Sequence, residues 1–92
     1  MSTERAHACF EGRVQGVGFR AHTLRVAETF AVVGHVRNLD DGRVEVVVQG
    51  EKGQVDAFLE ALGSSLSRYI RHTRVDREHP VEPPPGQFRI AD

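Results

Sequence analysis

The residues best suited to chemistry lie in one short stretch, Gly12 to Arg20, which reads GRVQGVGFR. Gly16 and Gly18 follow an alternating, strand-like segment, and a helical pattern begins directly after them. Glycines at such a turn allow backbone N–H groups to converge on an anion, and the positive end of the new helix adds to the attraction. Arg20 falls in the first helical turn, where its flat fork of donors suits phosphate or carboxylate oxygens. The stretch therefore predicts an anion-binding site.

Two familiar phosphate-binding motifs do not describe this stretch. It lacks the Gly-Lys-Ser/Thr ending of a Walker A loop. It also lacks the third glycine and the following ribose-binding acid of a dinucleotide-binding unit. A glycine turn alone is weak support for binding, so the arginine carries the prediction.

Asn38 is the second candidate for a functional side chain. It closes a predicted strand directly before the turn Leu39-Asp40-Asp41-Gly42. An asparagine at such a place often only forms the turn. However, Arg20 and Asn38 both lie at ends of elements that flank the glycine turn, so the two side chains could converge.

Hydrophobic periodicity predicts the elements that position these residues. Alternating side chains predict strands over residues 6–14, 32–38, 43–49 and 69–77, with a short final strand around Phe88 and Ile90. Apolar residues at helical spacing predict one helix from Phe19 to about Phe30 and another from near Lys52 to residues 63–65. The Asp-Gly pair at 41–42 predicts a hairpin between the second and third strands.

This order of elements predicts an α+β fold of the ferredoxin-like type, a βαββαβ sandwich. We expect one antiparallel sheet with two helices on one face and a short final edge strand. A chain of 92 residues fits a single domain over residues 1–92 with a shallow site. The proline-rich segment 80–85 is expected to be a stiff connector rather than a binding segment. Because the fold hosts many functions, the side chains must decide among them.

Composition argues against a nucleic-acid partner. The formal net charge is −1, and basic and acidic residues are interspersed along the chain. An RNA-binding sheet of this fold needs aromatic residues on its open face, where this chain has Glu45, Val47 and Gln49. We therefore expect no nucleic-acid binding.

The polar N-terminus and the absence of a long apolar run predict a cytoplasmic protein without membrane contact. The single cysteine, Cys9, has no cysteine or histidine at ligand spacing, and the histidines other than His35 are scattered, so neither a metal nor a cofactor is expected. The chain is expected to be a monomer.

Two segments, 12–20 and 34–46, closely resemble the signature segments of the acylphosphatase family. The resemblance continues to about residue 63 and is looser beyond it. It implies an enzyme that hydrolyses the carboxyl-phosphate bond of small acyl phosphates, with no metal and no covalent intermediate. One departure is His35, where the family commonly has an aromatic residue; we expect it to be a packing change on the sheet surface that leaves activity intact.

The resemblance also implies roles for particular residues. Arg20 matches the phosphate-binding arginine of the family, and Asn38 matches its water-orienting asparagine. The substrate phosphate would be held by the backbone amides of a loop that comprises Gln15, Gly16, Val17, Gly18 and Phe19.

Two other functions are carried as alternatives. The chain is similar to the acylphosphatase-like module of hydrogenase-maturation carbamoyltransferases, which handles carbamoyl phosphate. It could also be a non-catalytic ferredoxin-like module that binds an anion or a partner. That second alternative explains Arg20 but not the context of Asn38.

Overall fold

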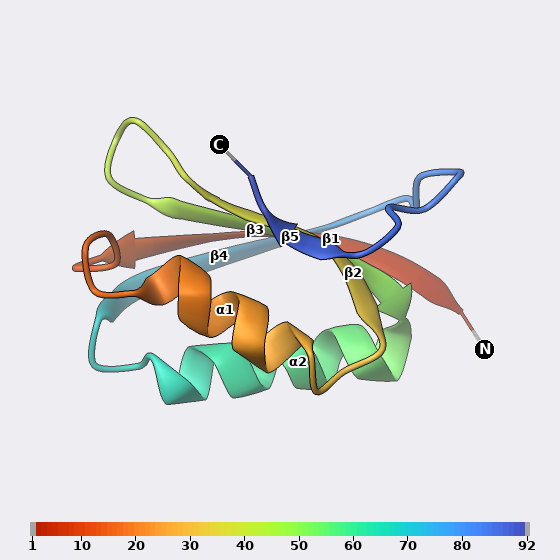
Figure 1. Ribbon diagram of the computed structural model, residues 1–92, viewed down its shortest axis with the longest axis horizontal. Coiled ribbons are helices and arrows are strands. Elements are labelled where there is room, and N and C mark those ends of the chain that lie inside the picture. The colour runs from red at the N-terminus through yellow and green to blue at the C-terminus, as the bar shows by residue number, and fades with distance from the viewer. Residues whose placement is uncertain (1, 92) are drawn as a thin grey trace.

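The computed structural model describes residues 2–91, which form five strands and two helices (Figure 1). In chain order these are β1 (Thr3–Gly12), α1 (Phe19–Ala27), β2 (Val32–Asn38), β3 (Val44–Glu51), α2 (Lys52–Ser65), β4 (Ile70–Glu78) and β5 (Phe88–Ile90). The predicted α+β class and the βαββαβ order with a short last strand are confirmed.

The strands form one sheet in the order β4-β1-β3-β2-β5. The pairs β1–β3, β1–β4 and β2–β3 are antiparallel, but β5 pairs with β2 in parallel. The expectation of a purely antiparallel sheet was therefore wrong, and the sheet is mixed. The cause is the strand order: β4 runs opposite to β2, so a chain that reverses after β4 and joins the far edge must run along β2.

Both helices cover the same face of the sheet, and the core lies between the two layers (Figure 1). Val44, Val46 and Val48 point into this core, as the alternation predicted. From α2 the buried side chains are Val55, Phe58 and Leu62, which recur at helical spacing. α1 packs against the β2–β5 edge and contacts both of those strands.

Some element ends differ from the predicted ones. β1 ends at Gly12, where the backbone turns to φ 138° and the pairing with β4 shifts register, rather than at Val14. α1 ends at Ala27 rather than near Phe30, because the chain tightens into short-range bonds such as Thr29 N–H to the Val26 carbonyl at 3.0 Å. Within residues 2–91, no helix combines the length and the apolar character needed to cross a membrane.

The sheet face opposite the helices is less open than the sequence suggested. Gln49 is only 1% exposed there, because the proline-rich loop lies against it. Its side-chain amide donates to the Val81 carbonyl at 3.1 Å and accepts from the Val81 N–H at 2.9 Å. The loop between β4 and β5 is thus fixed to β3 by a pair of hydrogen bonds as it crosses to the β2 edge.

Candidate active site

The carboxyl ends of β1, β2 and β5 lie at the same edge of the sheet. β1 and β2 both pair antiparallel with β3 and so share a direction, and β5 runs parallel to β2. The loop after β1 and the N-terminus of α1 therefore meet the ends of β2 and β5. A pocket of about 260 Å³ lies at this junction, and it is lined by Val14, Gly16, Gly18, Phe19, Arg20, Ala21, Asn38 and Ile90.

The loop into α1 is shaped by two glycines in the left-handed region. Gly16 has φ 80°, and Gly18, the residue that caps α1, has φ 79° and ψ 20°. A side chain at either place would be strained, so the turn requires glycine. No side chain of residues 2–91 caps the start of α1, and its first turn carries no acidic residue. Its first N–H groups are thus left without a side-chain acceptor, which suits an anionic ligand.

Hydrogen bonds tie the first half of this loop to two neighbouring segments. The Arg13 N–H donates to the Tyr69 carbonyl at 2.9 Å, on the β4 side. Gln15 Nε2 donates to the carbonyls of Leu39 and Arg43 at 2.8 and 3.0 Å, which joins the loop to the turn between β2 and β3. The loop and the residue before that turn, Asn38, are therefore fixed relative to each other.

Arg20 brings positive charge to the pocket. Its side chain is exposed, and it forms no ion pair with any carboxylate in the part of the chain that the structure describes. The neighbouring Phe19 anchors the first turn of α1, since its ring lies 5.3 Å from that of Phe10 and its carbonyl accepts from Thr23 Oγ1 at 2.8 Å. The guanidinium thus extends from a fixed turn beside the glycine loop.

Asn38 ends β2 and faces the same pocket. Within residues 2–91, its Oδ1 atom is buried and accepts no hydrogen bond. A buried acceptor without a partner costs on the order of 1–3 kcal/mol. The orientation of the amide is consequently not fixed by a bond to Oδ1, and rotation about its terminal bond can exchange the oxygen for the nitrogen at the pocket.

Most of the predicted site residues meet at this pocket. Arg20 and Asn38 line it, as do Gly16, Gly18 and Phe19 from the predicted loop. The other two loop residues are not among its lining: the Gln15 side chain bonds the neighbouring turn, and the Val17 side chain packs against the core.

Three lining residues were not predicted as part of the site. They are Val14, Ala21 and Ile90. Val14 directly precedes the predicted loop and Ala21 directly follows Arg20, so both are neighbours of predicted site residues in the sequence. Ile90 lies far away in the chain, and only the parallel pairing of β5 with β2 brings it here.

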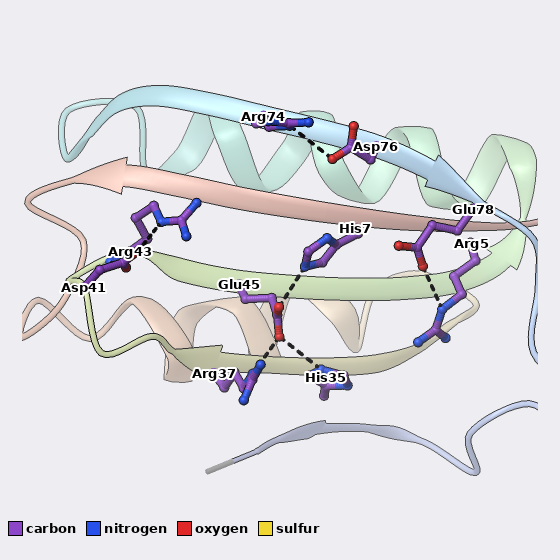
Figure 2. A network of polar contacts seen from close by, with 10 residues as sticks. All are labelled: Arg5, His7, His35, Arg37, Asp41, Arg43, Glu45, Arg74, Asp76 and Glu78. Carbon is purple, nitrogen blue, oxygen red and sulfur yellow. Dashed lines mark hydrogen bonds and ion pairs between the residues drawn. The ribbon is translucent and has the colours of Figure 1, made fainter.

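A second, wider hollow of about 450 Å³ lies on the face opposite the helices, and Figure 2 shows the polar network within it. Glu45 is its centre. Its carboxylate accepts from Arg37 Nε at 2.6 Å, contacts His7 Nε2 at 2.7 Å, and lies 3.6 Å from His35 Nε2. His35 thus lies on the open face, as predicted, although as a neighbour of a carboxylate.

Electrostatics in this network favour the charged carboxylate. Burial alone would raise the pKa of Glu45, but the hydrogen bonds from Arg37 and His7 outweigh it and lower the pKa to about 2. For His35, burial outweighs the attraction of Glu45 and lowers its pKa below the usual value. Among residues 2–91, no group of three or more His, Cys, Asp or Glu side chains is arranged so that it could hold a metal ion.

Comparison with known proteins places this geometry in a family. The family model described as Acylphosphatase matches residues 6–90. The chain belongs to the acylphosphatase family. As a member it is an enzyme that hydrolyses small acyl phosphates to a carboxylate and inorganic phosphate, and the predicted resemblance is confirmed.

Individual relatives agree with this family. An acylphosphatase of Chromohalobacter salexigens is 49% identical over 82 residues, which cover 87% of this chain and 88% of that protein. The crystal structure of acylphosphatase from Bacillus subtilis superimposes with a TM-score of 0.85 at 29% identity, covering 97% of this chain and 99% of that one. HypF from T. kodakarensis is 32% identical with a TM-score of 0.70, but only 12% of that longer chain is covered, against 97% of this one.

Proposed function

We propose that this acylphosphatase binds the substrate phosphate with Arg20 and the backbone amides of residues 15–19, and that Asn38 orients the attacking water. The observation that supports this most directly is that three features meet at one pocket. Within residues 2–91 they are an arginine without an ion pair, a helix start without a side-chain cap, and an asparagine whose buried amide oxygen has no partner. Phosphate would supply the negative charge. Water would supply the missing donor once the amide has rotated so that Oδ1 faces the pocket.

The chemistry of the leaving group makes so sparse a site sufficient. An acyl phosphate releases a carboxylate, whose conjugate acid has a pKa near 4, so it departs without being protonated. The transferred phosphoryl group passes through a loose transition state with charge on its peripheral oxygens. Fixed positive groups around those oxygens, here Arg20 and the loop amides, can supply most of the acceleration.

Asn38 acts in this scheme by position rather than by basicity. With its amide rotated so that Oδ1 faces the pocket, the oxygen accepts a hydrogen bond from water and directs the lone pair of the water at phosphorus. The proton of the water passes to a phosphate oxygen of the substrate. A rate that followed the ionisation of an enzyme histidine, rather than that of the substrate, would contradict this last step.

The first test is hydrolysis of benzoyl phosphate in the presence of a chelator, with the parent protein compared with Asn38→Ala. We expect roughly a hundredfold loss of kcat in the variant, because the water loses its orientation, while inhibition by inorganic phosphate is unchanged. Arg37→Ala is the matched control, since Arg37 is the preceding residue on β2 and belongs to the opposite face; it should retain activity within about twofold.

Three results would weigh against the proposal. Equal activity of the Asn38 and Arg37 variants would remove the water-orienting role. Hydrolysis in ¹⁸O-labelled water that placed the label in benzoate rather than in phosphate would show attack at the carbonyl carbon. Binding of phosphate without any hydrolysis by the folded parent would favour the non-catalytic alternative.

One observation supports the alternative that the chain handles carbamoyl phosphate. The chain matches a small part of a much longer protein, HypF, with 32% identity to the T. kodakarensis chain. This agrees with a module that can be part of a larger enzyme. The two candidates separate on substrate preference: a higher kcat/KM for carbamoyl phosphate than for benzoyl phosphate would favour the module, and the reverse would favour the stand-alone enzyme.

We also propose that residues 1–92 form a single domain that acts as a monomer in the cytoplasm. The single sheet and single hydrophobic core of residues 2–91 support the first point. The lone Cys9, which cannot form a disulfide within this chain, supports the compartment. Light scattering at several protein concentrations tests the oligomeric state.

A further inference from the structure

The active-site pocket has a polar part and an apolar part. The loop glycines, Arg20 and Asn38 form the polar part. Of the apolar lining residues, Val14 and Phe19 belong to the core, with exposures of 0% and 2%. Ile90, in contrast, remains 39% exposed. Its large apolar side chain lines the pocket and is only partly covered by neighbouring residues.

The position of Ile90 follows from the pairing of β5. Ile90 lies opposite Val36 in the parallel register with β2, and the Ala91 N–H donates to the Val36 carbonyl at 2.8 Å. Two residues earlier, Phe88 packs with its ring 5.5 Å from that of Phe58 in the core. Because side chains alternate along a strand, Ile90 shares the helix side of the sheet with Phe88. It is therefore held beside the end of β2 by backbone pairing and by an aromatic anchor.

Exposure alone would carry no meaning, since single apolar residues are common on protein surfaces. Val75 and Val81 are each 40% exposed, and neither lines the active-site pocket. What distinguishes Ile90 is that it shares a hollow of about 260 Å³ with Arg20 and Asn38. A substrate whose phosphate is bound at the polar part has its acyl group only one bridging oxygen away. The acyl group must therefore extend from the polar part towards another part of the pocket or its surroundings.

We propose that Ile90 forms the wall of an acyl subsite, and that the enzyme prefers acyl phosphates with an apolar group next to the carbonyl, aromatic or branched aliphatic, over acetyl phosphate. The inference rests on the proposed phosphate site at Arg20 and the loop. Contact between Ile90 and the acyl group removes apolar surface from water, which favours binding in proportion to the area covered.

The kinetic signature follows from where the bond breaks. The acyl substituent is remote from the phosphorus, so its contact with Ile90 is as strong in the ground state as in the transition state. Such uniform binding lowers KM and leaves kcat unchanged. Loss of the wall should therefore raise KM for the apolar substrate alone.

The test compares benzoyl phosphate with acetyl phosphate in the parent, in Ile90→Ala and in Ile90→Thr, with chelator present. Threonine keeps the β-branch that suits a strand, so it preserves β5 while making the wall polar. We expect KM for benzoyl phosphate to rise about three- to tenfold in both variants, with kcat, KM for acetyl phosphate and inhibition by inorganic phosphate all unchanged. Val75→Ala, at an equally exposed valine on β4, is the matched control and should change none of these values.

The outcomes separate the subsite from the phosphate site. Equal KM changes for both substrates, or no change for benzoyl phosphate in folded variants, would overturn the role of Ile90 even though the parent enzyme works. A parent without activity on either substrate, or without inhibition by phosphate, would instead refute the proposed phosphate site. Thermal unfolding of each variant verifies that β5 is still in place.

Discussion

Two adjacent residues of β2 belong to regions of opposite character. Arg37 lies on the open face, where its Nε donates to Glu45 at 2.6 Å within a network of paired charges. Asn38, the next residue, lines the pocket with Arg20, where the part of the chain described by the structure supplies no carboxylate. The pleat of the strand separates the two, because successive side chains point to opposite faces.

The difference shows what each region does with its charge. In the open-face network, the charges neutralise one another, and the result is cohesion among β1, β2 and β3. In the pocket, the guanidinium of Arg20 forms no ion pair with any of residues 2–91, so its electrostatic attraction remains available to a substrate. A carboxylate beside Arg20 would compete with phosphate for the same donors. We therefore expect substitutions in the pocket to change catalysis and substitutions in the network to change stability.

The largest effect is expected from Arg20→Ala. Removal of a donor that stabilises developing charge costs about 2.7–4 kcal/mol in the transition state, or roughly a hundred- to a thousandfold in kcat/KM. Stability should change by no more than about 0.5 kcal/mol, because the side chain is exposed and forms no ion pair within residues 2–91. Steady-state hydrolysis of benzoyl phosphate and urea unfolding measure the two quantities.

Arg25→Ala is the control for that prediction, since Arg25 is an exposed arginine of the same helix and does not line the pocket. It should behave like the parent protein in both assays. A loss of activity in Arg25→Ala as large as that in Arg20→Ala would show that α1 needs positive charge in general, not a phosphate ligand at one position.

The next effect concerns stability and tests the other side of the comparison. Glu45→Gln removes the charge that holds Arg37 and His7, so we expect the free energy of unfolding at pH 7 to fall by on the order of 2 kcal/mol. Activity at saturating substrate should stay within about twofold, because Glu45 does not line the pocket. Urea unfolding and kcat are the measurements.

The pH dependence sharpens the same prediction. The pKa of Glu45 is lowered from 4.5 to about 2 in the folded protein, so its stabilising contribution is complete above pH 4.5 and is lost as the pH falls towards 2. The pKa of His35 is also lowered, mainly by burial, which disfavours folding once the pH falls below 6.5. In Glu45→Gln the loss of stability between pH 4.5 and 2 should be smaller than in the parent, and an identical acid profile would contradict this assignment.

The smallest effect is expected from an exposed ion pair. Arg74 and Asp76 on β4 lie 3.1 Å apart, with side chains 72% and 51% exposed. Water and salt screen such a pair, and it contributes less than about 1 kcal/mol. Arg74→Ala should therefore unfold within about 0.5 kcal/mol of the parent and hydrolyse benzoyl phosphate at the same rate, and a loss as large as that from Glu45→Gln would contradict the distinction between buried and exposed pairs.

Local patterns in the sequence were enough to predict most of the fold. Alternation and helical spacing gave the elements in order, and the Asp41-Gly42 pair correctly indicated the hairpin between β2 and β3. The direction of β5 relative to its neighbour β2 could not be predicted from local patterns. It depends on which sheet edge the chain joins after β4, and that is decided by packing across the whole molecule.

In the candidate site, too, residues that are neighbours in the sequence were predicted, whereas contacts made by strand pairing were not. Gly16, Gly18 and Arg20 are neighbours in the chain, so their spacing alone indicated a site. Gln15 was expected to contribute its backbone amide to the loop, but no local pattern indicated that its side chain would hydrogen-bond the turn after β2. Ile90 was missed because its place in the pocket results from pairing between strands that are distant in the chain.

The Glu45 network was also beyond local patterns. Alternation correctly put His35 and Arg37 on one face of β2, and Glu45 on the open face of β3. Their contact depends on the register that sets His35 opposite Val47 and Arg37 opposite Glu45. His7, one of the histidines that are scattered along the sequence, joins the network through the register of β1, in which Cys9 lies opposite Glu45.

The late position of β5 in the chain has a consequence for the order in which the enzyme is made. The proposed phosphate-binding and water-orienting residues, from the glycine loop to the turn after Asn38, belong to the first half of the chain. Ile90 follows every other strand and helix. Because synthesis proceeds from the N-terminus, a chain emerging from the ribosome contains the proposed phosphate-binding residues before it contains Ile90 of the proposed acyl subsite. Ile90, on which the proposed selectivity for the acyl group depends, is thus the last residue of the pocket to be synthesised.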